Sequence, residues 1–105
     1  MNEISVVITC YNEESYIGQT IESVLKQKEY NAIKEIIIVN DGSKDKSEEI
    51  IKKYLNSNSK IKYIYQKNKG LSITRNTAIK CCSGNYIALL DGDDIWSQEK
   101  VKIQF

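Results

Sequence analysis

Short apolar runs and longer amphipathic stretches alternate along this chain. Runs rich in Ile, Val and Leu, bounded by polar turn residues, predict four strands, at residues 4–9, 35–40, 60–66 and 85–90. Between them, apolar side chains recur at the three- and four-residue spacing of a helix face and predict three helices. The positions that define these faces are Ile17, Ile21, Val24 and Leu25, then Ile50, Ile51, Tyr54 and Leu55, and finally Ile73, Ala78, Ile79 and Cys82.

The order of these elements predicts the fold class. Because strands alternate with helices, we expect one α/β domain: a parallel βαβαβαβ sheet with right-handed crossovers and helices on both faces, a Rossmann-like sandwich. Run 60–66 is the least apolar and suits an edge of the sheet, whereas run 85–90 predicts a buried strand. Asp45 with Glu48 predicts a capping box for the second helix, and Ser72 is the expected N-cap of the third.

The aspartates gather where such a sheet binds its ligands. In open parallel sheets, ligands bind outside the carboxyl ends of the strands. All five aspartates lie just after such an end, whereas all nine glutamates lie elsewhere. The preference of Asp for turns and helix N-caps is enough to explain Asp45. It explains less well why three aspartates follow a single strand.

The acidic run Asp91-Gly92-Asp93-Asp94 follows directly on the fourth apolar run. Carboxylates this close repel one another unless a cation neutralises them. Oxygen-only ligands favour a hard divalent ion such as Mg²⁺ or Mn²⁺. We therefore expect a metal at Asp91 and Asp93 and, through it, a bound polyanion. The alternative is a solvated turn in which Asp94 or Ser97 caps a helix.

Composition excludes several other chemistries. The net charge of +1 gives no overall field that would recruit nucleic acid or an anionic membrane. The chain has no His, so the commonest general base and transition-metal ligand is missing. The three cysteines lack CxxC spacing, which argues against a zinc site or a disulfide framework and favours a reducing compartment. No apolar run approaches the roughly 20 residues of a membrane span, so we expect a cytoplasmic protein.

The loop after the first strand contains no glycine, and neither G-x-G-x-x-G nor G-x-x-x-x-G-K-[ST] occurs anywhere. Binding of NAD or ATP by those two routes is therefore disfavoured. Tyr11 instead offers a ring that can stack on a base, and Asp41 offers an acceptor for the N–H edge of that base. With a diphosphate on the metal at Asp91 and Asp93, these residues predict a nucleoside-diphosphate site.

Four segments together resemble glycosyltransferase family 2. Residues 4–14 resemble its opening strand and loop, and residues 35–43 and 68–76 look like its second and third motifs. Residues 84–96 are similar to the segment that carries its metal-binding D-x-D motif. The resemblance covers nearly the whole chain, in order and at family spacing. It implies the N-terminal part of a GT-A fold and transfer of a sugar, with inversion, from a nucleoside-diphosphate-sugar to an acceptor hydroxyl.

Matched by position, the resemblance also implies functional residues. The implied nucleotide-sugar site consists of Thr9, Tyr11, Glu13, Asp41, Arg75 and Asp91. Asp41 matches the acid that binds the base, usually uracil, and Arg75 matches a basic residue near the donor. Asp91 and Asp93 match the D-x-D pair that holds Mn²⁺ or Mg²⁺, with Asp93 as the expected direct ligand. Taken alone, Tyr11 can equally cap the core, Glu13 can favour a helix N-terminus, and Arg75 can form a structural ion pair.

The chain departs from the family pattern in three places. Asn40-Asp41 stands where two acids are common, Thr9 stands where Pro is frequent, and Ser97-Gln98 stands where a Pro usually follows the D-x-D region. A larger difference is that the family's catalytic base and acceptor site lie downstream. We therefore expect residues 1–105 to be a truncated donor-binding domain without a catalytic residue of its own and inactive in isolation.

The resemblance implies a saccharide or lipid-linked acceptor, as in cell-envelope polysaccharide synthesis, and a longer protein that is cytoplasmic or peripheral at the inner membrane face. Strand edges left bare by truncation favour self-association. Two other classes of function stay open: a non-catalytic nucleotide-binding or assembly module of the same fold, and a phosphoacceptor receiver-like domain. The receiver-like domain needs an acidic pair after the first strand, whereas Glu13-Glu14 lie four residues beyond it.

Overall fold

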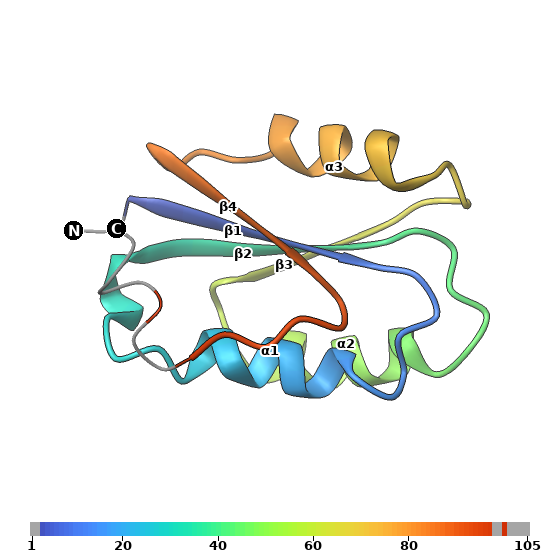
Figure 1. The fold of residues 1–105 in the computed structure, drawn as a ribbon, viewed down its shortest axis with the longest axis horizontal. Coiled ribbons are helices and arrows are strands. Elements are labelled where there is room, and N and C mark those ends of the chain that lie inside the picture. Colours follow the sequence, from blue (N-terminus) through green and yellow to red (C-terminus); the bar gives the residue numbers. More distant parts are fainter. Residues whose placement is uncertain (1–2, 98–99, 101–105) are drawn as a thin grey trace.

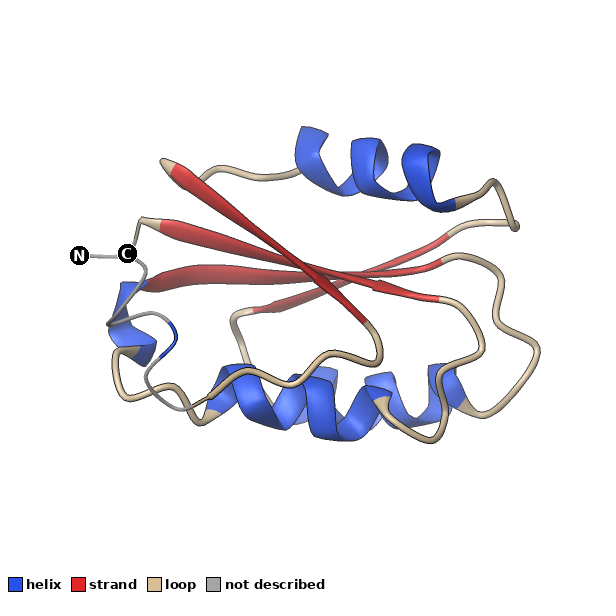
Figure 2. Ribbon diagram, in the orientation of Figure 1, coloured by secondary structure: helices blue, strands red, loops and turns tan. Residues whose placement is uncertain are grey.

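The computed structural model describes residues 3–97 and residue 100, and these build one parallel sheet between two layers of helix (Figure 1). The strands are β1 (Ile4–Cys10), β2 (Ile33–Asn40), β3 (Ile61–Tyr65) and β4 (Tyr86–Asp91), in the order β3-β2-β1-β4. The helices are α1 (Ile17–Leu25), α2 (Ser47–Ser57) and α3 (Leu71–Lys80), with a 3-10 turn η1 (Tyr30–Ala32). Helices α1 and α2 cover one face and α3 covers the other (Figure 2). The predicted α/β fold class is confirmed.

The two central strands are apolar on both sides because helices cover both of their faces. Val6 and Ile8 of β1 point into the larger core under α1 and α2, whereas Val7 points into a smaller core with Val39 and Ala78 under α3. Each of these five side chains is fully buried. The unbroken apolar runs in the sequence therefore correspond to strands enclosed between helix layers.

Strand β3 is an edge strand, as predicted, but the prediction of a buried fourth strand is only half right. Strand β4 forms the opposite edge, and its burial alternates along its length. Ala88 and Leu90 are buried in the larger core, whereas Ile87 and Leu89 are 40% and 47% exposed on the other face. The reason is that α3 packs over β1 and β2 and leaves this side of β4 accessible in the described part of the chain.

Two predicted helix caps are wrong. Helix α2 begins at Ser47, and Asp45 accepts hydrogen bonds from the amides of Ser47 (2.9 Å) and Glu14 (3.0 Å). Asp45 therefore ties the start of α2 to the loop after β1 in place of a capping box. Helix α3 begins at Leu71, one residue before the expected cap Ser72, directly after a glycine with φ of 93°.

One charged group, the Glu35 carboxylate of β2, is deeply buried at the amino end of the sheet. Its Oε2 accepts hydrogen bonds from Ser5 Oγ (2.6 Å) and Ser83 N (2.7 Å), and its Oε1 accepts one from Lys62 Nζ (2.8 Å). These partners belong to β1, to β3 and to the loop between α3 and β4. Glu35 therefore joins three neighbouring strands at the end opposite the aspartates.

In the part of the chain that the structure describes, no helix is long and apolar enough to cross a membrane. The sequence departure at Ser97-Gln98 lies partly outside the described residues, because Gln98 is not among them.

Candidate functional site

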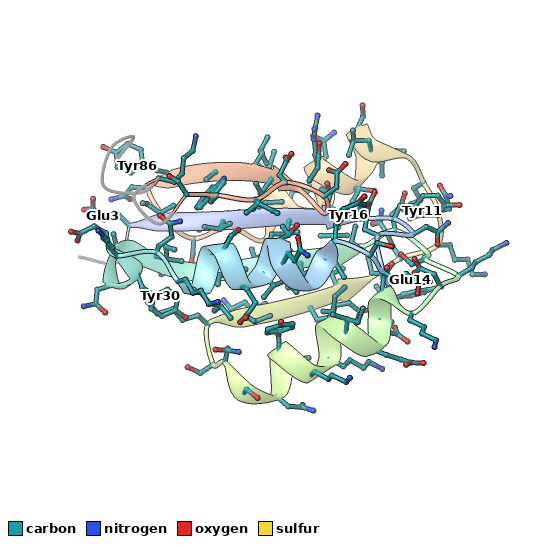
Figure 3. The ribbon with its side chains drawn as sticks, turned by 60° about the horizontal axis from the view of Figure 1, so that its bottom comes forward. Glu3, Tyr11, Glu14, Tyr16, Tyr30 and Tyr86 are labelled. Carbon is teal, nitrogen blue, oxygen red and sulfur yellow. The ribbon has the colours of Figure 1, made fainter. Side chains whose placement is uncertain are left out.

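A pocket of about 370 Å³ opens at the carboxyl end of the sheet. It lies where the chain order reverses, since β1 pairs with β2 on one side and with β4 on the other. Such a reversal point is where open parallel sheets bind ligands. Figure 3 shows Tyr11 and Glu14 at this end of the molecule, with Glu3 and Tyr30 at the other. The lining residues are Thr9, Cys10, Tyr11, Glu13, Asp41, Asn68, Gly70, Leu71, Thr74, Asp91, Gly92 and Asp93.

The residues predicted for the nucleotide and metal site come together at this pocket. All of them line it except Arg75, whose guanidinium Nη2 lies 3.3 Å from Asp91 Oδ1. Arg75 thus forms the ion pair that sequence analysis left open, and its partner is itself a predicted ligand. The folded chain places the predicted base-binding and metal-binding groups around one cavity.

Asp41 is buried, and its carboxylate anchors the segment that leads into α3. Oδ1 accepts hydrogen bonds from Gln66 Nε2 (2.9 Å) and Lys69 N (2.8 Å), and Oδ2 accepts one from Gly70 N (3.1 Å). Burial alone would raise the pKa of Asp41, but these hydrogen bonds outweigh it and lower the pKa below its usual value. A carboxylate offers about four acceptor positions, and donors of the chain itself occupy at least three of them.

The acidic loop, defined as Asp91–Asp94, gathers its carboxylates tightly. One oxygen from each of Asp91, Asp93 and Asp94 lies within 4.8 Å of the others. Thr9 Oγ1 donates to Asp91 Oδ1 at 3.1 Å, the same oxygen that faces Arg75, and Asp94 Oδ2 accepts from the Asp91 amide at 3.1 Å. Asp93 and Asp94 are exposed. Clustered, accessible carboxylate oxygens are the donor set that suits Mg²⁺ or Mn²⁺.

Glu13 adds a fourth carboxylate facing the acidic loop. Its pKa is raised, first by burial and then by the negative charges around it, Asp93 foremost. Gly92 makes the close approach possible, because a Cβ there would lie 3.0 Å from the Thr9 carbonyl oxygen and 3.1 Å from Glu13 Cγ. A bound cation would relieve the repulsion among these carboxylates.

Residues that sequence analysis missed hold the pocket loops together. Asn12 has a φ of 52°, its amide donates to Ser43 Oγ (2.9 Å), and its Oδ1 accepts from Lys44 N (2.8 Å). The available sequence signal was that Asn tolerates left-handed backbone better than most residues. These bonds clamp the loop after β1 onto the loop after β2. Tyr11, at the tip, is 45% exposed, so it does not cap the core.

Known proteins share this sequence and fold. Residues 5–105 match the sequence profile of the family described as Glycosyl transferase family 2. Glycosyltransferase GlyA of Streptococcus pneumoniae is 41% identical over 101 residues, covering 96% of this chain and 14% of GlyA. A crystal structure of S. aureus TarS 1–349 in complex with UDP-GlcNAc superposes with a TM-score of 0.86 at 31% identity, covering 96% of this chain and 29% of that one.

A more distant neighbour shares the fold. Mannosyltransferase PcManGT from Pyrobaculum calidifontis, solved in complex with GDP-Man and Mn²⁺, has a TM-score of 0.86 at 17% identity and covers 94% of this chain and 30% of that one. The parallel sheet with its pocket at the reversal point is thus the N-terminal portion of a GT-A fold. The chain belongs to glycosyltransferase family 2. It spans less than a third of the length of each protein named above.

Proposed function

We propose that this chain forms the donor-binding part of a glycosyltransferase that takes a UDP-sugar and transfers the sugar, with inversion, to an acceptor hydroxyl. The observation that carries the proposal is that Tyr11, Asp41, Asp91 and Asp93 line the same pocket. The Tyr11 ring and the Asp41 carboxylate suit the base of a nucleoside diphosphate. The carboxylates of Asp91 and Asp93 suit a cation that binds its diphosphate.

The base end rests on Tyr11 and Asp41. The exposed Tyr11 ring can stack on a pyrimidine, and the Asp41 carboxylate, which lines the pocket, can accept the N–H that uracil presents. The UDP-GlcNAc complex of TarS, at 31% identity over almost the whole chain, supports UDP as the donor nucleotide.

The diphosphate end rests on Asp91 and Asp93, which would hold Mn²⁺ or Mg²⁺. A bound divalent cation supplies Lewis-acid stabilisation of the charge that develops on the leaving diphosphate. Arg75 orients Asp91 and contributes a fixed positive charge nearby. Among the described residues, Arg75 Nε is buried without a hydrogen-bond partner, while Nη2 of the same guanidinium faces Asp91.

Transfer also needs an acceptor hydroxyl, expected on a saccharide or a lipid-linked saccharide, and a base to take its proton. Neither is assigned to residues 1–105, so we expect the isolated chain to bind the donor without transferring its sugar. The exposed thiol of Cys81 and the absence of a disulfide among the described cysteines favour a cytoplasmic setting. Family membership disfavours the assembly-module and receiver-like alternatives.

The test is a calorimetric titration of the chain with UDP, with and without Mn²⁺. We expect Mn²⁺ to tighten UDP binding at least tenfold, and Asp93→Asn to remove that gain while leaving metal-free binding unchanged. Glu29→Gln, which neutralises an exposed carboxylate at the amino end of the sheet, is the matched control and should behave as wild type. Equal Mn²⁺-dependent affinity in Asp93→Asn and wild type would refute the metal assignment.

A further inference from the structure

Helix α1 and the residues just past it carry three buried polar side chains on a face that is otherwise apolar. Thr20, Ser23 and Gln27 are 0%, 9% and 4% exposed, beside the buried Ile21 and Val24. Their spacing places them along one line of the helix, with Gln27 just past its end. Burying hydroxyl and amide groups is unfavourable unless they are hydrogen-bonded, so their partners explain why they lie here.

Those partners are backbone groups of the segment that follows β4. Thr20 Oγ1 donates to the Gly92 carbonyl oxygen (2.9 Å), within the acidic loop itself, and shares this hydrogen with the Tyr16 carbonyl oxygen four residues back, at the longer distance of 3.2 Å. Ser23 Oγ accepts from the Trp96 amide (3.0 Å). Gln27 Nε2 donates to the Ser97 carbonyl oxygen. Two residues of α1 and one just past its end thus attach the chain at and immediately beyond the predicted metal ligands.

Bonds inside the helix order this line of side chains. The Ser23 hydroxyl donates to the Thr20 carbonyl oxygen (2.7 Å), which leaves its lone pairs free for the Trp96 amide. Gln27 Nε2 also donates to the Ser23 carbonyl oxygen (3.0 Å). Both hydrogens of this nitrogen are therefore used, one on the helix and one on the segment after β4. Thr20 and Ser23 belong to α1 and Gln27 is hydrogen-bonded to it, so the helix fixes the position of the segment after β4.

The anchor that matters most for chemistry is Thr20. Gly92 lies between Asp91 and Asp93, and its carbonyl oxygen accepts the hydrogen bond from Thr20. Three clustered carboxylates repel one another and would spread apart in a free loop. If the backbone is already held in the compact arrangement, cation binding does not have to include the free-energy cost of ordering the loop. Hydrogen-bond partners of metal-binding segments raise metal affinity in this way.

We propose that Thr20, backed by Ser23 and Gln27, is a positioning residue that holds the acidic loop in the arrangement that binds the divalent cation and the donor diphosphate. This inference rests on the proposed function, since it assigns Thr20 a part in the same site. Thr20 touches neither ligand and acts through the backbone of Gly92.

The test compares Thr20→Val, which keeps the shape and removes the hydroxyl, with Thr20→Ser, which keeps the hydroxyl. Thr77→Val is the matched control, because the Thr77 hydroxyl donates within its own helix, to the Ile73 carbonyl oxygen. Free Mn²⁺ is measured by electron paramagnetic resonance during titration with UDP, and metal-free UDP affinity by calorimetry. We expect Thr20→Val to weaken Mn²⁺ binding in the presence of UDP by about 10-fold or more, the scale of losses behind metal ligands.

Thr20→Ser and Thr77→Val should stay within about threefold of wild type, and metal-free UDP affinity should be the same in all variants. If Thr20→Val binds Mn²⁺ like wild type, or Thr20→Ser loses as much as Thr20→Val, the positioning role is wrong. If NMR spectra of the backbone amides show that Thr20→Val does not fold, Ser23→Ala is used in its place. We expect Ser23→Ala to weaken Mn²⁺ binding to the same extent, and a Mn²⁺ affinity equal to that of wild type would overturn the inference. A wild type without metal-dependent UDP binding would overturn the proposed function and the inference together.

Discussion

Replacing the buried Glu35 by glutamine tests how charge stabilises this fold. Glu35 is 1% exposed, and burial alone would raise its pKa, but the hydrogen bonds from Lys62, Ser5 and Ser83 lower the pKa from 4.5 to about 2. One pKa unit corresponds to about 1.4 kcal/mol, so the ionised carboxylate stabilises the folded state by about 3 kcal/mol at neutral pH. Because the folded-state pKa is the lower one, this contribution is complete above about pH 5 and is lost as the pH falls from 4.5 towards 2.

Urea unfolding followed by circular dichroism at pH 7, 5 and 3 measures the effect. We expect the free energy of unfolding of Glu35→Gln to lie about 3 kcal/mol below wild type at pH 7 and 5, and only about 1 kcal/mol below it at pH 3. The dependence of the unfolding free energy on urea concentration, the m-value, should be the same for both proteins. Equal m-values show that their unfolded states are comparable. Glu29→Gln, at an exposed position, should match wild type throughout. A deficit that stays constant from pH 7 to pH 3 would refute the reasoning.

Two further predictions concern packing and buried polar groups. Gly84→Ala should lower the free energy of unfolding by about 1–3 kcal/mol, because the new Cβ would lie 2.6 Å from the Glu3 carbonyl oxygen just before β1. Gly18→Ala, within α1, should raise it by up to about 1 kcal/mol, because the nearest atom to the new Cβ is Ile50 Cγ2 at 3.6 Å. Equal unfolding midpoints for these two variants would contradict the geometry. Tyr63→Phe should cost about 1–3 kcal/mol, because the Tyr63 hydroxyl accepts from the buried Asn40 amide (3.0 Å) and donates to Glu48 Oε2 (2.7 Å). Thermal unfolding measures the loss, with the exposed Tyr65→Phe as control, and an equal loss in both variants would exclude this cause.

Asn40 also accounts for the departure from the family's usual pair of acids. Its Oδ1 accepts from the Ser43 amide (2.9 Å), while its Nδ2 donates to the Tyr63 hydroxyl. An ionised carboxylate has no hydrogen to donate, so it could not make the second bond to Tyr63 as Asn40 does. Asn40 thus shapes the turn that carries Ser43, and Asp41, the acid that follows it, lines the pocket.

The sequence alone determined the kinds of element, their order and the end of the sheet at which the aspartates gather. These follow from local information: the apolar period separates strand from helix, and alternating strands and helices require a parallel sheet whose carboxyl ends meet at one edge. The four family motifs also predicted six of the residues that line the pocket, namely Thr9, Tyr11, Glu13, Asp41, Asp91 and Asp93.

The tertiary structure decided what depends on contacts distant in sequence. It placed β4 beside β1 at the sheet edge, so that one face of a strand predicted to be buried is exposed. It paired Arg75 with Asp91 and occupied three acceptor positions of Asp41. It also brought Thr20 to Gly92, although 72 residues separate them. No local pattern records such pairings, because they depend on strand order and on which helix face meets which loop once the core has packed.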